Sequence, residues 1–338
     1  MLTVGRLNIP QTSHNGGVGF VQRVKLLQKR YLSYCQIRKL DYEKIDGDLR
    51  LDSETASFEK HDWFLIIGTA GLWGASPLFI DIALDDFHPS LITWLRVLFG
   101  CLTIWIFPSN SEAVRASDRR KVMLLGFTWM AFPLSMFPIA QQWVNSSMTG
   151  MLYSAVPILT VMIAAAFFQV STSPQRLKGI CIGLIGIVLI SSPEISTDNT
   201  NAFGVGLMFL AFISYGIGFN LAGPLQSQYG SIPVVRRALT LATLLTTPLG
   251  IYGTLSSSFS LQAMSACLVL GAGGTGIAYI WSSKLTGRVG AVRSSIVAYL
   301  FPIEAAILGV MFRGDSISYF AIIGVVIAIS GAYQTNSN

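Results

Sequence analysis

Long apolar runs, separated by short polar connections, follow one another from residue 63 to near the end of the chain. A window of about 19 residues finds runs that are long enough, or nearly so, to cross about 30 Å of hydrocarbon as helices. The pattern predicts ten membrane-spanning helices, at 63–84, 89–107, 122–143, 146–168, 177–192, 203–222, 234–255, 261–283, 290–312 and 316–335. The fifth run is the shortest, and its glycines Gly179, Gly183 and Gly186 indicate close packing against a neighbouring helix.

The second half of the chain repeats the first at an offset of 145 residues, with no gap across about sixty positions. The identities include Leu125-Gly126 with Leu270-Gly271, Pro157-Ile158 with Pro302-Ile303, Phe167 with Phe312, Gly179 with Gly324, Ile182 with Ile327, and Gly186 with Gly331. Five spans in each copy is an odd number, so the two copies must insert with opposite orientation. We therefore predict an all-α integral membrane protein, an inverted repeat of two five-helix units at 63–192 and 203–335. Such duplication is typical of secondary transporters.

Composition agrees with a membrane protein, because 52% of the residues are hydrophobic, only 12% are charged and the mean hydropathy is +0.57. Lys and Arg are retained on the cytoplasmic side of membranes. With the N-terminus inside, the inner connections and adjoining helix ends hold eleven basic residues, whereas the outer ones hold only Arg313. We predict that both termini are cytoplasmic and that the fifth segment crosses the membrane.

Residues 1–62 are predicted to form a disordered cytoplasmic tail. Residues 1–40 carry seven basic and no acidic residues, and residues 41–62 carry eight acidic and three basic ones. No apolar core of a secretory signal is present. Three interpretations stay open: an organelle transit peptide, an arm that contacts anionic lipid, and an extension upstream of the true start.

The apolar region resembles the EamA family of the drug/metabolite transporter superfamily over about residues 63–335. The resemblance rests on several motifs: Leu72-Trp73-Gly74, Arg96, "YSAVPILTVMIAAAFF", Tyr215-Gly216, Arg236-Arg237 and "AYLFPIEAAILGVMF". It implies a ten-helix secondary carrier, often an exporter, for amino acids, metabolites or cationic drugs. It also implies a cavity lined mainly by the third, fourth, eighth and ninth helices, with the first and sixth beside them. Family members commonly have an acidic residue shortly after the fourth and ninth helices; this chain has Asp315 after the ninth but Gln169-Val170 after the fourth.

Glu304 is the most informative single residue, because it lies two positions after Pro302 in an otherwise apolar span, where a carboxylate without compensation is costly. Protonation coupled to transport, a cationic substrate, or an ion pair with Arg96 would each compensate for it. A rise of 1.5 Å per residue places Arg96 and Glu304 at similar depth from the outer surface. For Arg96 taken alone, structural anchoring is the favoured interpretation.

Pro157 and Pro302 occupy equivalent places in the two repeats, and each removes a backbone donor. We expect the substrate cavity near these matched kinks, although prolines in membrane helices also simply shape packing. Aromatic residues near the kinks could stack on a substrate or attract a cation. The candidate substrate-binding or coupling residues are Glu304, Arg96, Tyr153, Pro157, Tyr299, Pro302, Trp73, Tyr215 and Trp281.

The stretch from Gly271 to Gly276 matches the dinucleotide-binding spacing, but it lies inside a predicted span, so we interpret it as small residues that let helices approach closely or unwind. Four scattered cysteines and three histidines suggest no zinc site, no cofactor and no catalytic group. We therefore expect no enzyme, but a transporter of a small organic solute. The alternative is a non-transporting membrane sensor or assembly protein that retains the bundle.

The expected partners are a small-molecule substrate and the lipid bilayer. Coupling to protons and assembly as a homodimer are open alternatives, and no nucleic acid is expected. A bacterial inner membrane is the first choice of location, and a plastid membrane is the second.

Overall fold

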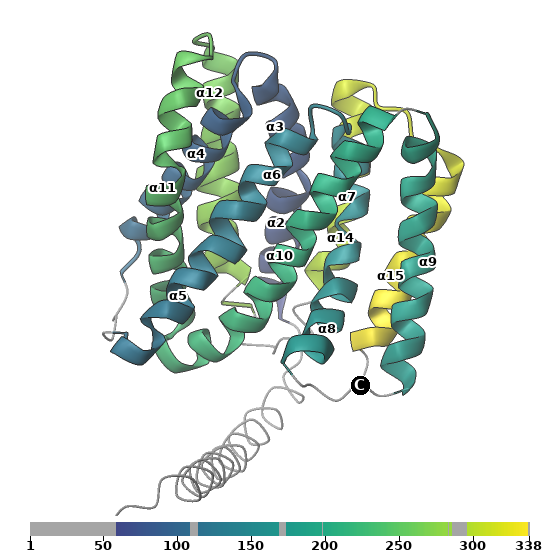
Figure 1. Cartoon of the computed structure of the whole chain (residues 1–338), viewed down its shortest axis with the longest axis horizontal. Helices are drawn as coiled ribbons and strands as arrows, with labels where there is room; N and C mark the ends of the chain where they lie inside the picture. Colours follow the sequence, from purple (N-terminus) through teal and green to yellow (C-terminus); the bar gives the residue numbers. More distant parts are fainter. Residues whose placement is uncertain are drawn as a thin grey trace, which may run out of the picture. The chain divides into compact units, whose positions relative to one another are not determined.

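The computed structural model describes residues 59–108, 114–168, 174–197, 199–282, 284–285 and 296–336, and within these ranges it contains helices and no strand (Figure 1). Nearly all of the predicted tail lies outside the described residues. The α-helices are α2 (Lys60–Gly74), α3 (Ser76–Leu84), α4 (Pro89–Ile106), α5 (Arg119–Leu125), α6 (Phe132–Ala140), α7 (Ser146–Leu152), α8 (Ala155–Phe167), α9 (Pro174–Thr197), α10 (Asn199–Tyr229), α11 (Ser231–Leu255), α12 (Leu261–Leu268), α14 (Ile296–Arg313) and α15 (Tyr319–Asn336).

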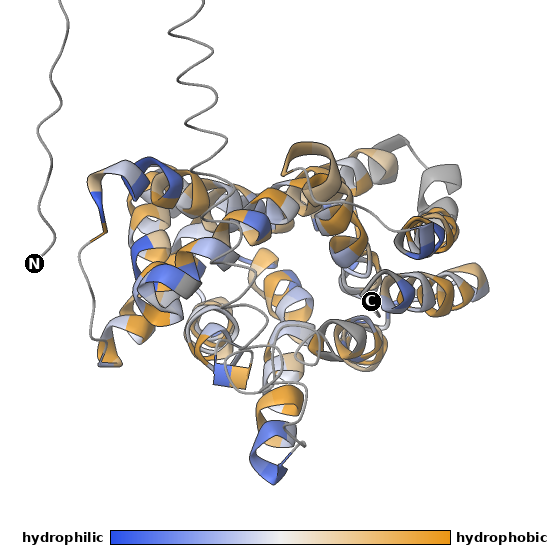
Figure 2. Ribbon diagram, turned by 90° about the horizontal axis from the view of Figure 1, so that it is seen from below, coloured by the Kyte–Doolittle hydropathy of each residue, from blue (hydrophilic) through white to orange (hydrophobic). Residues whose placement is uncertain are grey.

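The prediction of an all-helical membrane protein is confirmed. Within the described ranges, seven helices are long and apolar enough to cross a bilayer: Lys60–Leu84, Pro89–Ile106, Ala116–Ala140, Ser146–Phe167, Ala202–Gln226, Ser231–Leu255 and Leu261–Ser282. Shorter apolar helices occupy Leu177–Ile190 and Tyr319–Gln334, and α14 occupies the predicted ninth span. Many large apolar side chains of these helices are exposed, as expected for a surface in contact with lipid. Hydrophobic residues are spread over most of the helices (Figure 2).

Several spans are interrupted, and the interruptions matter for the site. The first span breaks at Ala75, between α2 and α3, and the fourth breaks at Tyr153 and Ser154, between α7 and α8. The third and eighth spans each contain a π-helix, η2 (Gly126–Ala131) and η3 (Val269–Ile277). Single turns of π-helix inside α-helices occur frequently at functional sites, because they re-aim side chains.

Helices α9 and α15 pack backbone to backbone along the edge of the bundle (Figure 1). A Cβ atom added to Gly186 would lie 2.6 Å from the carbonyl oxygen of Gly324, and one added to Gly331 would lie 2.6 Å from the carbonyl oxygen of Gly179. No larger residue fits at such a distance. The close packing predicted from the glycines of the fifth span is therefore confirmed, and α15 is the neighbour.

The small-residue stretch of η3 brings α4 equally close. A Cβ on Gly271 would lie 2.7 Å from the carbonyl oxygen of Arg96, and a Cβ on Gly100 would lie 2.7 Å from Cγ2 of Thr275. The prediction that this stretch permits close helix approach is confirmed. It holds the backbone beside Arg96 against the eighth span.

Hydrogen bonds tie the helix connections together at two opposite ends of the bundle. At one end, which we call the Asp85 end, the backbone N–H of His88 donates to Ser257 Oγ, and that of Ser258 donates to the carbonyl of Asp86, which joins the α3–α4 and α11–α12 connections. At the other, which we call the Tyr229 end, the Tyr229 hydroxyl donates to Asp118 Oδ2. The α3 and α10 helices thus finish at opposite ends of the bundle.

Candidate functional site

Arg96 projects from the middle of α4 into the bundle, where its side chain is buried at 6% exposure. Its Nε donates a hydrogen bond of 3.0 Å to Thr275 Oγ1 on η3. Among the described residues no carboxylate lies within ion-pair distance of Arg96. A cation is therefore held inside an apolar bundle by one neutral hydroxyl.

Aromatic rings surround this cation. The break between α7 and α8 places Tyr153 inside the bundle, where its ring lies 4.3 Å from that of Phe301 and stacks on Phe137 at 5.5 Å between centroids. Tyr215 on α10 lies 5.9 Å from both Tyr153 and Phe137. Arg96, Phe137 and Tyr153 line one cavity. Aromatic faces and hydroxyls thus form the walls of the site.

A cavity lies between Arg96 and these rings. It is lined by Ser76, Pro77, Ile80, Arg96, Phe137, Tyr153 and Phe301, which come from the first, second, third, fourth and ninth spans. Its volume is about 20 Å³, which is room for about one water molecule. In this conformation the cavity is too small for an organic solute, which would bind only after the helices separate.

Glu304 lies one helical turn beyond Phe301 on α14 and is half-buried against α2. Its Oε2 is enclosed and has no hydrogen-bond partner in the described part of the chain. A Cβ on Gly74 would lie 2.7 Å from this oxygen, so the glycine makes room for the carboxylate. The described structure therefore does not form the ion pair of Arg96 and Glu304 that equal depth had made possible: Arg96 lines the cavity, whereas Glu304 lies against Gly74.

The three remaining aromatic candidates, Trp73, Trp281 and Tyr299, differ in their surroundings. Trp73 lies beside the aromatic cluster, since its Nε1 donates to the carbonyl of Gly274 at 2.9 Å and its ring meets Tyr279 edge-on at 5.6 Å. Trp281 lies elsewhere, against Gly68 and the ring of Phe64. Tyr299 is on α14, but its side chain lies outside the described residues.

The two prolines behave differently. Pro157 is in the first turn of α8, just after the break at Tyr153, whereas α14 continues as a helix through Pro302. Only Pro157 therefore adjoins an interruption of its span. The freed backbone is partly used locally, because the N–H of Val156 donates to the carbonyl of Tyr153.

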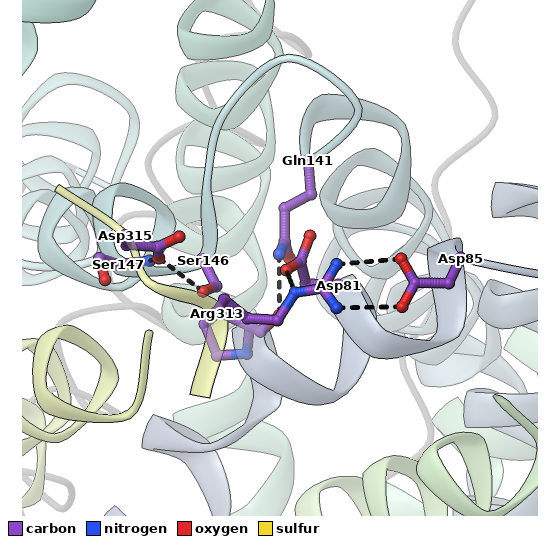
Figure 3. A network of polar contacts seen from close by, with 8 residues as sticks. Asp81, Asp85, Gln141, Ser146, Ser147, Arg313 and Asp315 are labelled. Atoms are coloured by element: carbon purple, nitrogen blue, oxygen red, sulfur yellow. Dashed lines mark hydrogen bonds and ion pairs between the residues drawn. The ribbon is translucent and has the colours of Figure 1, made fainter. Parts of the chain in front are cut away.

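A polar network lies at the Asp85 end of the bundle (Figure 3). Arg313, the last residue of α14, donates to Asp81 through Nε and to both oxygens of Asp85 through Nη1 and Nη2, each at 3.0 Å. Gln141 Nε2 donates to the carbonyl of Pro77 at 2.8 Å. An open hollow of about 420 Å³, lined by Asp81, Asp85, Asp86 and Gln141 among others, lies next to the network.

Asp315 extends this network to the fourth span. Its Oδ2 accepts hydrogen bonds from Ser146 Oγ and from the backbone N–H of Ser147, both at 2.8 Å (Figure 3). A carboxylate at the first turn of α7 also interacts favourably with the helix dipole. Asp315 thus fastens the connection after α14 to the start of α7.

Sequence reasoning missed Phe137, Phe301 and Thr275 as site residues. Phe137 and Phe301 each precede a proline, Pro138 and Pro302, and that position could have drawn attention to them. Thr275 lies in the small-residue stretch, where only the contact with Arg96 reveals its role. The network of Arg313 with Asp81 and Asp85 joins residues more than 200 positions apart, so no local pattern could have indicated it.

Comparison with known proteins fits this geometry. The model of the EamA-like transporter family matches residues 63–192 and 202–337. The chain belongs to the EamA-like transporter family. An EamA transporter is an integral membrane protein and not an enzyme, and it binds a small-molecule substrate within a lipid bilayer.

Individual relatives of this EamA protein are distant. It is 25% identical over 273 residues to an uncharacterized transporter YdfC of Bacillus subtilis, which covers 78% of this chain and 87% of the relative. It is 20% identical over 279 residues to a probable terminal-alkyne amino-acid exporter of Streptantibioticus cattleyicolor, with 81% and 92% covered. A crystal structure with 15% identity has a TM-score of 0.57 over 82% of this chain and 96% of the other, which supports the fold alone.

Proposed function

We propose that this EamA protein is a secondary transporter that moves a small organic solute by alternating access, with the cavity beside Arg96 as its binding site. The observation that carries the proposal is the cavity itself, because residues of both repeats line it and it holds a buried cation in an apolar bundle. Ionisable residues inside membrane bundles generally mark substrate or ion pathways.

An inverted repeat of ten helices is the architecture that we propose for this cycle. Two pairs of contacts support it, because the 145-residue offset exchanges their members. Gly186 corresponds to Gly331 and Gly324 corresponds to Gly179. The structure contains both the contact of Gly186 with Gly324 and the contact of Gly331 with Gly179. In the same way, Gly126 corresponds to Gly271 and Leu241 corresponds to Arg96. Gly126 contacts Leu241, and Gly271 contacts Arg96. Such reciprocity is what a pseudo-twofold axis requires.

The two π-helices support the same axis. The start of η2 at Gly126 corresponds under the offset to Gly271 in η3, so the third and eighth spans deform at matched places. The opposite directions of α3 and α10 agree with the odd number of spans per repeat. Two copies related in this way could exchange conformations and open the cavity to either end.

The network at the Asp85 end would act as a latch in this cycle. Arg313 belongs to the second repeat and Asp81 and Asp85 to the first, so their contacts hold the repeats together over the cavity. The side chains of Arg313 and Asp85 are 30% and 48% exposed, which makes the pair reversible in water. We assign the described conformation to a state that is closed at this end.

Glu304 is the coupling group that we propose. Its enclosed Oε2 has no partner in the described chain, so the carboxyl is compensated best by a proton that arrives and leaves during the cycle. Export across a bacterial inner membrane, with both termini and the Tyr229 end in the cytoplasm, agrees with the count of eleven inner basic residues against one. One relative is itself named a probable exporter.

Flux into proteoliposomes tests the proposal. Amino acids, organic acids, amines and quaternary cations would be supplied with and without an imposed pH gradient, to the parent and to Glu304→Gln. We expect gradient-dependent flux of at least one solute class that Glu304→Gln loses, while the variant still elutes as a folded protein. Absence of flux across the whole panel would favour the non-transporting alternative.

A further inference from the structure

We propose that Arg96 binds a carboxylate of the transported solute, so that the substrate is an organic acid with an apolar, preferably aromatic, body. The inference rests on the proposed transport function and names the substrate class of the same cavity. It departs from the sequence-based interpretation of Arg96 as a structural anchor.

The guanidinium of Arg96 is oriented but not satisfied. Nε is fixed by Thr275 Oγ1 at 3.0 Å, and among the described residues Nη1 and Nη2 have no hydrogen-bond partner. The residue is 94% buried and lines the cavity. A carboxylate fits the two terminal nitrogens of a guanidinium with two parallel hydrogen bonds, which is the geometry that favours Arg over Lys at such sites.

Packing alone does not require an arginine at this position. The repeat offset relates Arg96 to Leu241, and each residue packs against a glycine of a π-helix, Gly271 or Gly126. Leu241 makes this helix contact without a charge. The fold therefore does not require the charge of Arg96. Burying this cation costs several kcal/mol of desolvation, which indicates that the charge serves function.

Glu304 does not supply the missing anion. It lies against Gly74, and among the described residues its own Oε2 is enclosed without a partner. Within the described residues Arg96 has no carboxylate partner. Because the described residues supply no such anion, we assign this role to a carboxylate of the solute that enters the cavity.

The walls of the cavity indicate the rest of the solute. Phe137, Tyr153 and Phe301 line the cavity with their rings, and the rings of Tyr153 and Phe301 are in direct contact at 4.3 Å between centroids, so a planar group would take its place beside them once the site opens. Aromatic walls bind apolar and aromatic bodies, and the tyrosine hydroxyl adds a polar contact. The chemistry is that of an aryl or alkyl carboxylate.

Binding of four probes that share a phenyl ring tests the inference. 3-Phenylpropionate and phenylalanine carry a carboxylate, whereas 3-phenylpropylamine and 3-phenylpropanol do not. Affinities for the purified full-length protein would be measured through tryptophan fluorescence. We expect the two carboxylates to bind at least about tenfold more tightly than the amine and the alcohol. Equal or tighter binding of the amine or the alcohol would overturn the inference without any variant.

Variants of Arg96 sharpen the test. Arg96→Met should weaken 3-phenylpropionate at least about tenfold and leave 3-phenylpropanol unchanged, and Arg96→Lys should fall between parent and Arg96→Met. Arg120→Gln, an exposed arginine on α5, is the matched control and should bind like the parent. If Arg96→Lys and Arg96→Met both fold and both bind 3-phenylpropionate as tightly as the parent, the inference is overturned.

Flux of the same probes separates this inference from the proposed function. Transport of the amine but not of the carboxylates would overturn the assignment of Arg96 and leave the transporter intact. Carboxylate binding that depends on Arg96, without flux of any probe or panel solute, would sustain the site and overturn the transport proposal.

Discussion

Removal of the Arg313 side chain should open the Asp85 end of the bundle. Arg313 makes one ion pair with Asp81 and a two-pronged pair with Asp85. Exposed ion pairs are each worth about 0.2–1 kcal/mol, and Arg313→Gln also leaves two aspartates close to each other. The total of about 1–2 kcal/mol corresponds to a shift of about 5- to 30-fold in the ratio of open to closed molecules.

The shift can be measured at Ser76, which lines the cavity and is 6% exposed. In a background with the four native cysteines replaced, Ser76→Cys would be labelled with a membrane-impermeant thiol reagent added at the Asp85 end. Arg313→Gln should raise the labelling rate about 5- to 30-fold, and the difference should shrink in 1 M salt because ions screen exposed charges. Arg120→Gln is the control. An unchanged rate with Arg313→Gln would refute the latch.

Three further substitutions have matched controls. Gly186→Leu should lower the free energy of unfolding by at least about 2 kcal/mol, because α15 leaves no space for a side chain there. Gly206→Leu should be neutral, since a Cβ added at Gly206 meets no atom within 4 Å. Thermal unfolding in detergent measures both. Thr275→Val should weaken the binding of 3-phenylpropionate about 2- to 10-fold, because Arg96 Nε loses its hydrogen-bond acceptor. Thr254→Val should bind like the parent, since the Thr254 hydroxyl donates only to the backbone of its own helix. Equal affinities of the two variants would contradict the role of Thr275. Gly74→Ala should displace Glu304 and reduce gradient-driven flux severalfold. Gly71→Ala, whose added Cβ meets no atom within 4 Å, should retain the parent's flux. An equal loss of flux in both variants would contradict the role of Gly74 in making room for Glu304.

Much of the fold could be predicted because the bilayer imposes a simple rule on the sequence. Each span must be apolar over about 20 residues, so the runs mark the helices directly. The glycines of the fifth span revealed a backbone contact for the same reason, since few other residues allow helices so close. The breaks at Ala75 and Tyr153 and the π-helix η2 were not predicted, because they depend on packing between distant helices. For η3, the small residues from Gly271 to Gly276 had indicated close approach or unwinding.

The site was predicted only in part. Arg96, Tyr153 and Tyr215 were singled out because charge and aromatic groups stand out in apolar spans. Arg96 and Tyr153 line one cavity and Tyr215 lies beside Tyr153, while their part in binding stays a prediction. Equal depth wrongly suggested an ion pair for Arg96 and Glu304, because depth says nothing about the direction in which a side chain leaves its helix. Trp281 is aromatic but lies near the end of the predicted eighth span, where it packs against Gly68 of α2.

Counterflow tests alternating access most directly. Proteoliposomes loaded with each unlabelled solute of the panel in turn, 3-phenylpropionate included, would be diluted into a trace of the same solute with a radioactive label. A carrier that exposes one site to alternate sides predicts that labelled solute first accumulates above equilibrium and then declines, with loss of the overshoot in Arg96→Met. Simple equilibration without an overshoot, or uptake no faster than in liposomes without protein across the whole panel, would contradict the account.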